Sequence, residues 1–160
     1  MSLAFVALGS NLQNPVVQVN LAFEALDKLP ETTLLKRSSL YKTPPVGYDN
    51  QPDFINAAAL LETTLEPSVL LAQLLAIETA QGRKRPFPNA PRVLDLDLLL
   101  YDDLVMNTPT LTLPHPRLHE RGFVLFPLAE IAPDMMIAEK ASVADLLAAC
   151  TDKDIEKLRA

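Results

Sequence analysis

Two aspartates separated by one residue carry the strongest chemical signal in this chain of 160 residues. Asp95 and Asp97 alternate with leucines, so in a strand both carboxylates would point to one face and the leucines to the other. Aspartate is disfavoured in strands, and two like charges on one face repel each other. The apolar run that follows indicates a central, buried strand over 92–101, whose paired carboxylates need a metal ion or arginines as compensation.

Cations precede these aspartates and stand out in a chain whose net charge is −6. Arg83, Lys84, Arg85 and Arg92 enclose a proline-rich segment, 86–91. Charge runs are often only solvated surface, but this one leads directly into the aspartates, which favours a function. Carboxylates without supporting His or Cys suit Mg²⁺, and guanidinium groups match phosphate oxygens. The combination points to phosphoryl-type transfer, although an Asp-x-Asp motif alone is weak because unrelated nucleotide-sugar enzymes also contain it.

The composition predicts a single globular domain, residues 1–160, in the cytoplasm. Hydrophobic residues make up 49% and charged residues 21%. No apolar run reaches the roughly 18–20 residues that span a bilayer, and the N-terminus lacks the pattern of a signal peptide. The one cysteine excludes an intramolecular disulfide and a cysteine-based zinc site. The acidic balance argues against general nucleic-acid binding.

Hydrophobic periodicity and turn residues predict the other elements. A buried strand over 3–8 ends in a turn at 9–11. Helices begin at Pro15, capped by Asn14, and at Pro67, ended by Gly82. The remaining expected elements are strands over 32–41 and 54–62, a hairpin turn at 102–103 with a returning strand over 104–106, and helices over 124–131 and 142–150, the last capped by Ser142.

The order strand, helix, strand, strand, helix, strand is that of an α+β fold, the ferredoxin-like βαββαβ plait. We expect an antiparallel sheet with a hairpin extension and C-terminal helices. In this arrangement helices cover one face of the sheet, and the opposite face is free to carry a ligand site.

Three further polar positions leave alternatives open. Asn56 lies in a strand on the same face as Phe54, and such a residue is more often a structural tie than a ligand contact. Glu78 opposes the dipole at the end of its helix, so it either interacts with a nearby cation or ligand or is an exposed glutamate. His115 and His119 have the spacing of a helical metal pair, but the prolines around them argue against a helix and a zinc site.

Several segments together resemble the signature of the 6-hydroxymethyl-7,8-dihydropterin pyrophosphokinases of folate biosynthesis. The matching segments follow one another in order from Ala7 to about Pro133, and they are 7–12, 41–46, 51–57, 81–83, 90–97, 113–115 and 121–123. The resemblance implies a monomeric, Mg²⁺-dependent enzyme with the ferredoxin-like fold. Its reaction would move the β,γ-diphosphate of ATP onto the hydroxymethyl oxygen of the dihydropterin and release AMP.

The resemblance also implies roles for the matched residues. Asp95 and Asp97 would hold two Mg²⁺ ions, and with Arg83 and Arg92 would form the catalytic set. The positions matching ATP contacts are Glu78, Arg83, Arg85, Arg92, Thr112, His115 and Arg121. The pterin would lie between the rings of Phe54 and Phe123, and the residues completing its site are Thr43, Pro44, Val46 and Asn56. This role reverses the preference for Asn56 as a structural tie.

The chain departs from the family pattern at a few positions, which are Pro88, Asn89, Thr110 and Pro116; Phe54 replaces a frequent tyrosine but keeps a stacking face. We expect the loops over 43–52 and 83–91 to close over bound ATP. The alternative class is a ferredoxin-like sensor that binds a nucleotide without turnover. A sensor would not need paired carboxylates beside a basic loop.

Overall fold

The structure is a computed structural model that describes residues 1–44, 51–82, 93–116, 121–137, 141–150 and 155–158. The first half of the chain forms β1 (Ser2–Ser10), α1 (Pro15–Asp27), β2 (Thr32–Arg37), β3 (Tyr41–Thr43), β4 (Phe54–Thr63) and α2 (Pro67–Ala80). The second half forms β5 (Asp95–Tyr101), β6 (Met106–Asn107), β7 (Thr112–Leu113), α3 (Gly122–Ile131), β8 (Met136–Ile137), β9 (Ala141–Ser142), α4 (Val143–Ala149) and β10 (Glu156–Lys157).

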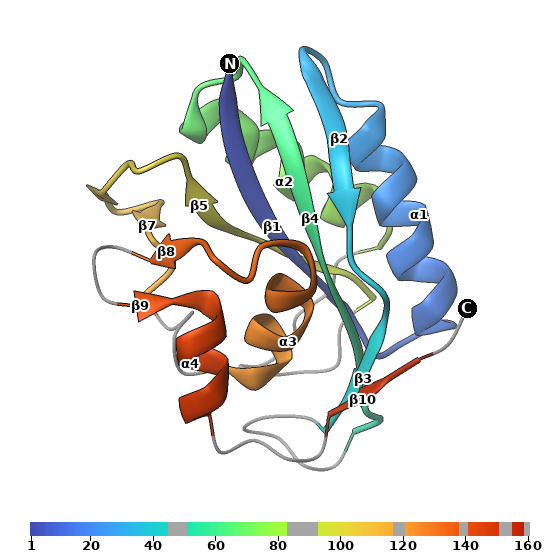
Figure 1. Cartoon of the computed structure of the whole chain (residues 1–160). Helices are drawn as coiled ribbons and strands as arrows, with labels where there is room; N and C mark the ends of the chain where they lie inside the picture. Colours follow the sequence, from blue (N-terminus) through green and yellow to red (C-terminus); the bar gives the residue numbers. More distant parts are fainter. Residues whose placement is uncertain (45–50, 83–92, 117–120, 138–140, 151–154, 159–160) are drawn as a thin grey trace.

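The main sheet is antiparallel, with strand order β10-β3-β4-β1-β5, and β2 also pairs with β4 (Figure 1). β1 and β4 pair over their length, from Ser2 opposite Thr63 to Ser10 opposite Ile55. Placing β1 between β4 and β5, with a helix in each crossover, is the arrangement of the βαββαβ plait. The predicted α+β, ferredoxin-like fold is therefore confirmed.

The strand expected over 32–41 is divided into β2 and β3, and both pair with β4. Ser38 lies at the break. Its hydroxyl accepts a hydrogen bond from the Ala58 N–H at 2.8 Å and donates to the Ser39 carbonyl at 2.7 Å. A serine that bonds the backbone in this way competes with the regular ladder of a strand, which explains the division.

Two expectations about β5 were wrong. β5 lies at the end of the described sheet and is not central. Its leucines are buried all the same, because the side chains of Leu94, Leu96 and Leu98 pack into the core that α1 and α2 cover. The segment 104–106 does not return along β5; instead β6 pairs with β7 in a separate two-stranded sheet. A run of apolar residues predicts that a strand is buried, but it does not predict whether the strand lies in the centre or at the edge of the sheet.

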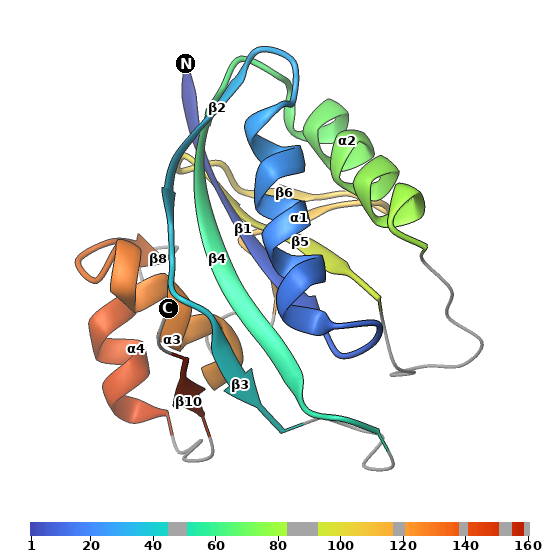
Figure 2. The same ribbon diagram turned by 90° about the vertical axis from the view of Figure 1, so that its right-hand side faces the viewer.

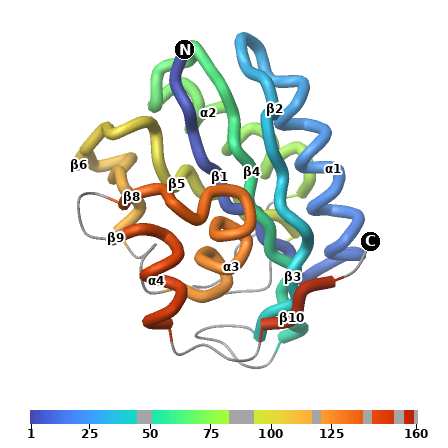
Figure 3. The backbone as a smooth tube through the Cα atoms, viewed as in Figure 1, coloured from blue at the N-terminus to red at the C-terminus, as the bar shows by residue number. Residues whose placement is uncertain are grey.

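Helices cover both faces of the sheet, so the expectation of one covered face was also wrong (Figure 2). On one face α1 and α2 pack on residues of β1 and β4 such as Val6 and Leu61. On the other face α3 and α4 pack on Phe5, Ala58 and Leu60. Figure 3 also shows the chain returning at β10 to the edge of the sheet beside β3. The face opposite α1 and α2 is therefore partly covered by α3 and α4.

The helix ends match the predictions in two of three cases. The Asp145 N–H donates to the Ser142 hydroxyl at 3.1 Å, which caps α4 as expected. Gly82 follows α2 with φ of 98°, a conformation that favours glycine. Asn14 precedes α1 in a left-handed conformation and makes no cap bond through its side chain. No helix in the described residues is long and apolar enough to cross a bilayer.

Candidate active site

The paired aspartates lie on the face of the sheet that α3 covers. The leucines that alternate with them belong to the core beneath α1 and α2, so Asp95 and Asp97 point the other way. Both are half-buried. Across β1, Asp95 pairs with Gly9 and Asp97 with Ala7. The carboxylates therefore stand beside two of the smallest side chains in the protein.

Ala7 and Gly9 form a floor on this face, between β5 and β4. Gly9 pairs with Asn56 of β4, and Ala7 pairs with Ala58. Because directly opposite residues in an antiparallel sheet share a face, two rows cross the strands. One row runs from Asn56 over Gly9 to Asp95, and the other from Ala58 over Ala7 to Asp97. The floor therefore lies between a buried amide and two carboxylates.

Gly9 is required by this close packing. A Cβ atom at Gly9 would lie 2.8 Å from the Asn56 Oδ1 atom and 3.9 Å from the Cδ1 atom of Phe54. The first distance is too short for a real contact, so any side chain there would displace Asn56. Gly9 was expected in a turn and this role was not predicted, although the residue lies in the matching segment 7–12; in the structure β1 extends through it.

Asn56 is held in a fixed orientation. Its side chain is buried, with 6% exposed, and Nδ2 donates to the Thr43 Oγ1 atom at 2.6 Å. Thr43, also buried, pairs with Phe54, which is half-buried beside Asn56. Pro44 follows and is exposed. Three residues of the predicted pterin set, Thr43, Phe54 and Asn56, therefore come together on β3 and β4.

Asn11 ties the end of β1 to the start of β4. Its Nδ2 atom donates to the Gln51 Oε1 atom at 2.8 Å and to the Pro52 carbonyl oxygen at 3.0 Å. The side chain is only 2% exposed. This contact fixes the chain just before Phe54. No role was predicted for Asn11 beyond the turn at 9–11, and the signal that could have identified it is again its place in segment 7–12.

Glu78 supports β5 from the side of α2. The residue is 1% exposed, and its Oε2 atom accepts a hydrogen bond from the Leu96 N–H at 2.7 Å. The alternative of an exposed glutamate is therefore wrong. Leu96 separates the two aspartates, so this bond fixes the peptide from which both project. The ATP contact that the resemblance implies for Glu78 stays a prediction.

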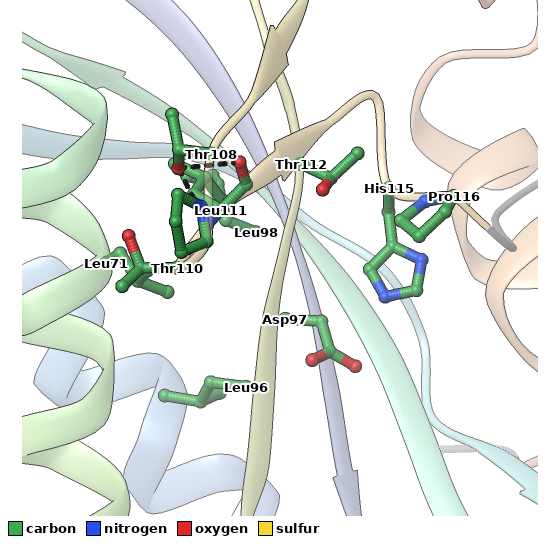
Figure 4. A pocket seen from close by; sticks show the side chains of 11 residues that line it. Leu71, Leu96, Asp97, Leu98, Thr108, Thr110, Leu111, Thr112, His115 and Pro116 are labelled. Atoms are coloured by element: carbon green, nitrogen blue, oxygen red, sulfur yellow. Dashed lines mark hydrogen bonds between the residues drawn. The ribbon is translucent and has the colours of Figure 1, made fainter.

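A cavity of about 270 Å³ lies beside β5, between α2 and the segment around β7 (Figure 4). Figure 4 shows Asp97 and His115 approaching the same space from β5 and from the segment after β7. The backbone N–H of His115 donates to the Leu99 carbonyl at 2.9 Å, which fixes the segment after β7 on β5. The residues that line the cavity are Leu71, Leu96, Asp97, Leu98, Thr108, Pro109, Thr110, Leu111, Thr112, His115 and Pro116. The lining combines leucines with an aspartate, a histidine and three threonines, so the cavity can meet both apolar and polar parts of a ligand.

The start of α3 brings two more predicted residues to this side of the sheet. Arg121 is the N-cap residue, and its Cζ atom lies 5.5 Å from the centroid of the Phe123 ring. This is a cation–π distance. Both residues are half-buried. The structure thus places Phe123 on the helix that covers the face carrying Phe54 and Asn56.

Most of the basic residues of the predicted site lie outside the described residues. The predicted site residues outside them are Val46, Arg83, Arg85 and Arg92. The other residues named above that lie outside them are Lys84, Pro88, Asn89 and His119. The closing movements expected of the loops over 43–52 and 83–91 also fall largely there. Of the departures from the family pattern, Thr110 and Pro116 line the cavity.

The donor set on β5 fits a divalent metal. Asp95 and Asp97 offer carboxylate oxygens from positions about 7 Å apart along the strand. Within the described ranges, no group of three or more His, Cys, Asp or Glu residues has the arrangement of a metal site. Mg²⁺ commonly uses one or two carboxylates together with water and substrate phosphates. The described residues therefore suit Mg²⁺ beside a polyphosphate.

Comparisons with known proteins agree on one family. The family model described as 7,8-dihydro-6-hydroxymethylpterin-pyrophosphokinase (HPPK) matches residues 5–133. A Pseudomonas aeruginosa protein named 2-amino-4-hydroxy-6-hydroxymethyldihydropteridine pyrophosphokinase is 46% identical over 154 residues, which are 96% of this chain and 95% of the relative. A Haemophilus influenzae protein of the same name is 42% identical over 158 residues, 99% of each chain.

A solved structure of a Plasmodium falciparum HPPK-DHPS protein has the same fold. Its TM-score is 0.81 at 14% identity, and the match covers 99% of this chain. The chain spans about half the length of that protein, with 49% of it covered. At this identity the likeness supports the fold alone. The family model and the curated relatives confirm the resemblance found in the motifs, and the chain belongs to the 7,8-dihydro-6-hydroxymethylpterin-pyrophosphokinase family.

Proposed function

We propose that this chain transfers diphosphate from ATP to the hydroxymethyl group of 6-hydroxymethyl-7,8-dihydropterin and releases AMP, a step of folate biosynthesis. The observation that carries the proposal is the pair of rows across the sheet. They place a buried amide, Asn56, and two carboxylates, Asp95 and Asp97, on one face with a flat floor between them. We also propose that the chain acts as a single-domain monomer in the cytoplasm.

The pterin occupies the floor in this proposal. A flat heteroaromatic ring stacks between the rings of Phe54 and Phe123, beside the Asn56 amide that packs against Gly9. Asn56 reads the amide-like edge of the ring with a side chain that Thr43 holds in one orientation. Selectivity follows because a ligand without matching polar groups would leave a buried amide unpaired. Pro44 and Val46 complete this end of the site.

ATP takes the cavity on the outer side of β5. The apolar side chains of Leu71, Leu98 and Leu111 suit a base, and Thr112 and His115 offer polar groups nearer to Asp97. The cavity, about 270 Å³, holds part of a nucleotide, so the triphosphate continues past Asp97 toward the floor. β5 thus lies between the two substrates, and its aspartates stand where the diphosphate must cross.

The aspartates position metal and phosphate. Asp95 and Asp97 would hold Mg²⁺, as two ions by the family resemblance, and the bound metal would supply positive charge for the triphosphate and for the transfer. Glu78 keeps the strand from shifting by holding the Leu96 N–H. In this proposal Arg83 and Arg92 brace the phosphates, and Arg85 and Arg121 contact ATP.

The test is AMP release from ATP, measured with and without the dihydropterin and with and without Mg²⁺. We expect AMP and the pterin diphosphate in equal amounts, only when both the pterin and Mg²⁺ are present. Removing the metal with EDTA should stop the reaction, and added Mg²⁺ should restore it. AMP formed without the pterin, or binding of both ligands without turnover, would refute the proposal; the second result would favour the sensor.

A further inference from the structure

One carboxylate near the end of α3 fastens this helix to β3. The Glu130 Oε1 atom accepts a hydrogen bond from the Tyr41 hydroxyl at 2.7 Å. The Ser39 N–H donates to both carboxylate oxygens, at 3.0 and 3.1 Å, and the Ser39 hydroxyl donates to Oε2 at 3.0 Å. We call Glu130, Tyr41 and Ser39 the α3 clamp. None of these residues has a role in the function proposed above.

The clamp lies on the same side of α3 as Phe123. Residues seven apart in a helix are two turns apart, about 10 Å, and share one side, so Phe123 and Glu130 belong to one stripe. Phe126 lies between them, and its ring centroid is 6.4 Å from that of Tyr41. Tyr41 therefore touches this stripe at Phe126 and at Glu130, which sets the position of the helix along β3.

The strand that receives the clamp also forms one end of the floor. Tyr41 pairs with Asn56, and Thr43, two residues further along β3, bonds the Asn56 amide. On the other side of the clamp, the hydroxyl of Ser38 accepts from the Ala58 N–H, which holds Ser39 beside β4. The helix that carries Phe123 is thus held in position against β3 and β4, and β4 carries both Phe54 and Asn56.

The charge on Glu130 is unusual for its place in the helix. A carboxylate at a helix C-terminus opposes the macrodipole, so it needs donors to be stable there. Burial works against the charged form, but the hydrogen bonds from Tyr41 and Ser39 outweigh this effect and lower the pKa of Glu130. The exposed Lys157 of β10, at 4.0 Å, adds little to such a pair. Glu130 therefore accepts these bonds as a carboxylate at neutral pH.

We propose that the α3 clamp sets the separation between Phe123 and the residues Phe54 and Asn56, so that Glu130 and Tyr41 are positioning residues for the pterin. They act through α3 and touch no reacting atom. This inference rests on the proposed function for the identity of the ligand. The cavity proposed for ATP lies at β5, on the far side of β1 and β4, and of the residues proposed to contact ATP only Arg121 belongs to the start of α3, so loosening the clamp weakens nucleotide binding less than pterin binding.

The test compares two tyrosine-to-phenylalanine variants. Tyr41→Phe removes the hydroxyl that bonds Glu130, and Tyr101→Phe removes a hydroxyl that donates to the Leu65 carbonyl at 2.6 Å, in the core on the opposite face. Both tyrosines are buried, so the variants lose the same group in similar surroundings. We expect Tyr41→Phe to raise the Kd of the dihydropterin about tenfold, and Tyr101→Phe to leave it within about twofold.

The Kd of the dihydropterin and the Kd of a non-hydrolysable ATP analogue are both measured by calorimetry in the presence of Mg²⁺. The Kd of that analogue should stay the same in Tyr101→Phe, and in Tyr41→Phe it should rise less than the Kd of the pterin. Glu130→Gln, which keeps an acceptor oxygen, should weaken pterin binding less than Glu130→Ala. If Tyr41→Phe does not fold, Ser39→Ala removes another bond of the clamp and should change the pterin Kd in the same direction.

The outcomes separate this inference from the proposed function. A wild-type chain that does not bind the pterin would refute the function itself. If the wild-type chain binds the pterin and Tyr41→Phe changes its Kd no more than Tyr101→Phe does, only the clamp is refuted. An equal loss of pterin and nucleotide affinity in Tyr41→Phe would also refute it, because that result is expected of general destabilisation.

Discussion

Replacing Gly9 by alanine tests the floor of the site directly. The added Cβ atom would lie 2.8 Å from the Asn56 Oδ1 atom, so the amide must move or the two strands must separate. Overpacking of this kind costs about 1–3 kcal/mol. A displaced Asn56 also loses its bond to Thr43, now 2.6 Å long, which is worth about 1 kcal/mol. The displaced amide also no longer meets the edge of the pterin in the proposed site. Since a lost hydrogen bond of about 1.4 kcal/mol corresponds to a factor of ten, we expect the pterin Kd of Gly9→Ala to rise about tenfold.

The assay is calorimetric binding of the dihydropterin, with urea unfolding to measure stability. A double-mutant cycle with Asn56→Ala isolates the contact, because the new methyl group has no amide to displace in that background. Gly9→Ala should therefore destabilise the Asn56→Ala variant less than it destabilises the wild-type chain. Wild-type affinity in Gly9→Ala, or an equal loss of stability in both backgrounds, would refute the reasoning about the floor.

Three further predictions concern β5 and the α3 clamp. Asp97→Ala should abolish AMP release and leave the melting temperature unchanged or higher, because it removes a charge that repels Asp95; retained turnover would contradict the metal assignment. Glu78→Ala should lower the free energy of unfolding in urea by about 1–3 kcal/mol, since the buried Leu96 N–H loses the acceptor 2.7 Å away; an unchanged value would contradict that role. The lowered pKa of Glu130 means that the unfolded chain takes up this proton first as the pH falls. The stability that Glu130 contributes is therefore complete well above pH 4.5, its ordinary pKa, and is lost as the pH falls below that value. The difference in melting temperature between the wild-type chain and Glu130→Gln, measured from pH 7 to pH 3, should shrink accordingly; a constant difference would contradict this prediction.

The alternation and the helical spacing of apolar residues predicted much of the fold of this chain. The pattern around Asp95 and Asp97 predicted which side chains share a face, because the two faces of a strand follow from its geometry alone. The helices that begin at Pro15 and Pro67 were predicted from their first residues and their apolar spacing, and the structure has both. These are local properties, and local sequence is sufficient to determine them.

The parts that sequence reasoning missed depend on contacts between distant segments. Asn11 bonds Gln51, which lies 40 residues away, and the reason for Gly9 appears only when Asn56 is its neighbour across the sheet. The second layer of helices was not predicted. The apolar side of a helix predicts that the helix packs on other elements, but it does not predict which face of the sheet the helix covers. The motif resemblance marked some of these positions without giving their physical reason.

The mistaken position of β5 has a functional consequence. A central strand would be paired on both sides, and only its two faces could meet a ligand. As the end strand of the described sheet, β5 has an outer side along which the chain around β7 and His115 builds the cavity. Asp97 borders that cavity and also the floor over β1. In the proposed reaction one strand can therefore present its carboxylates to both substrates, which is the arrangement that transfer between a nucleotide and a pterin requires.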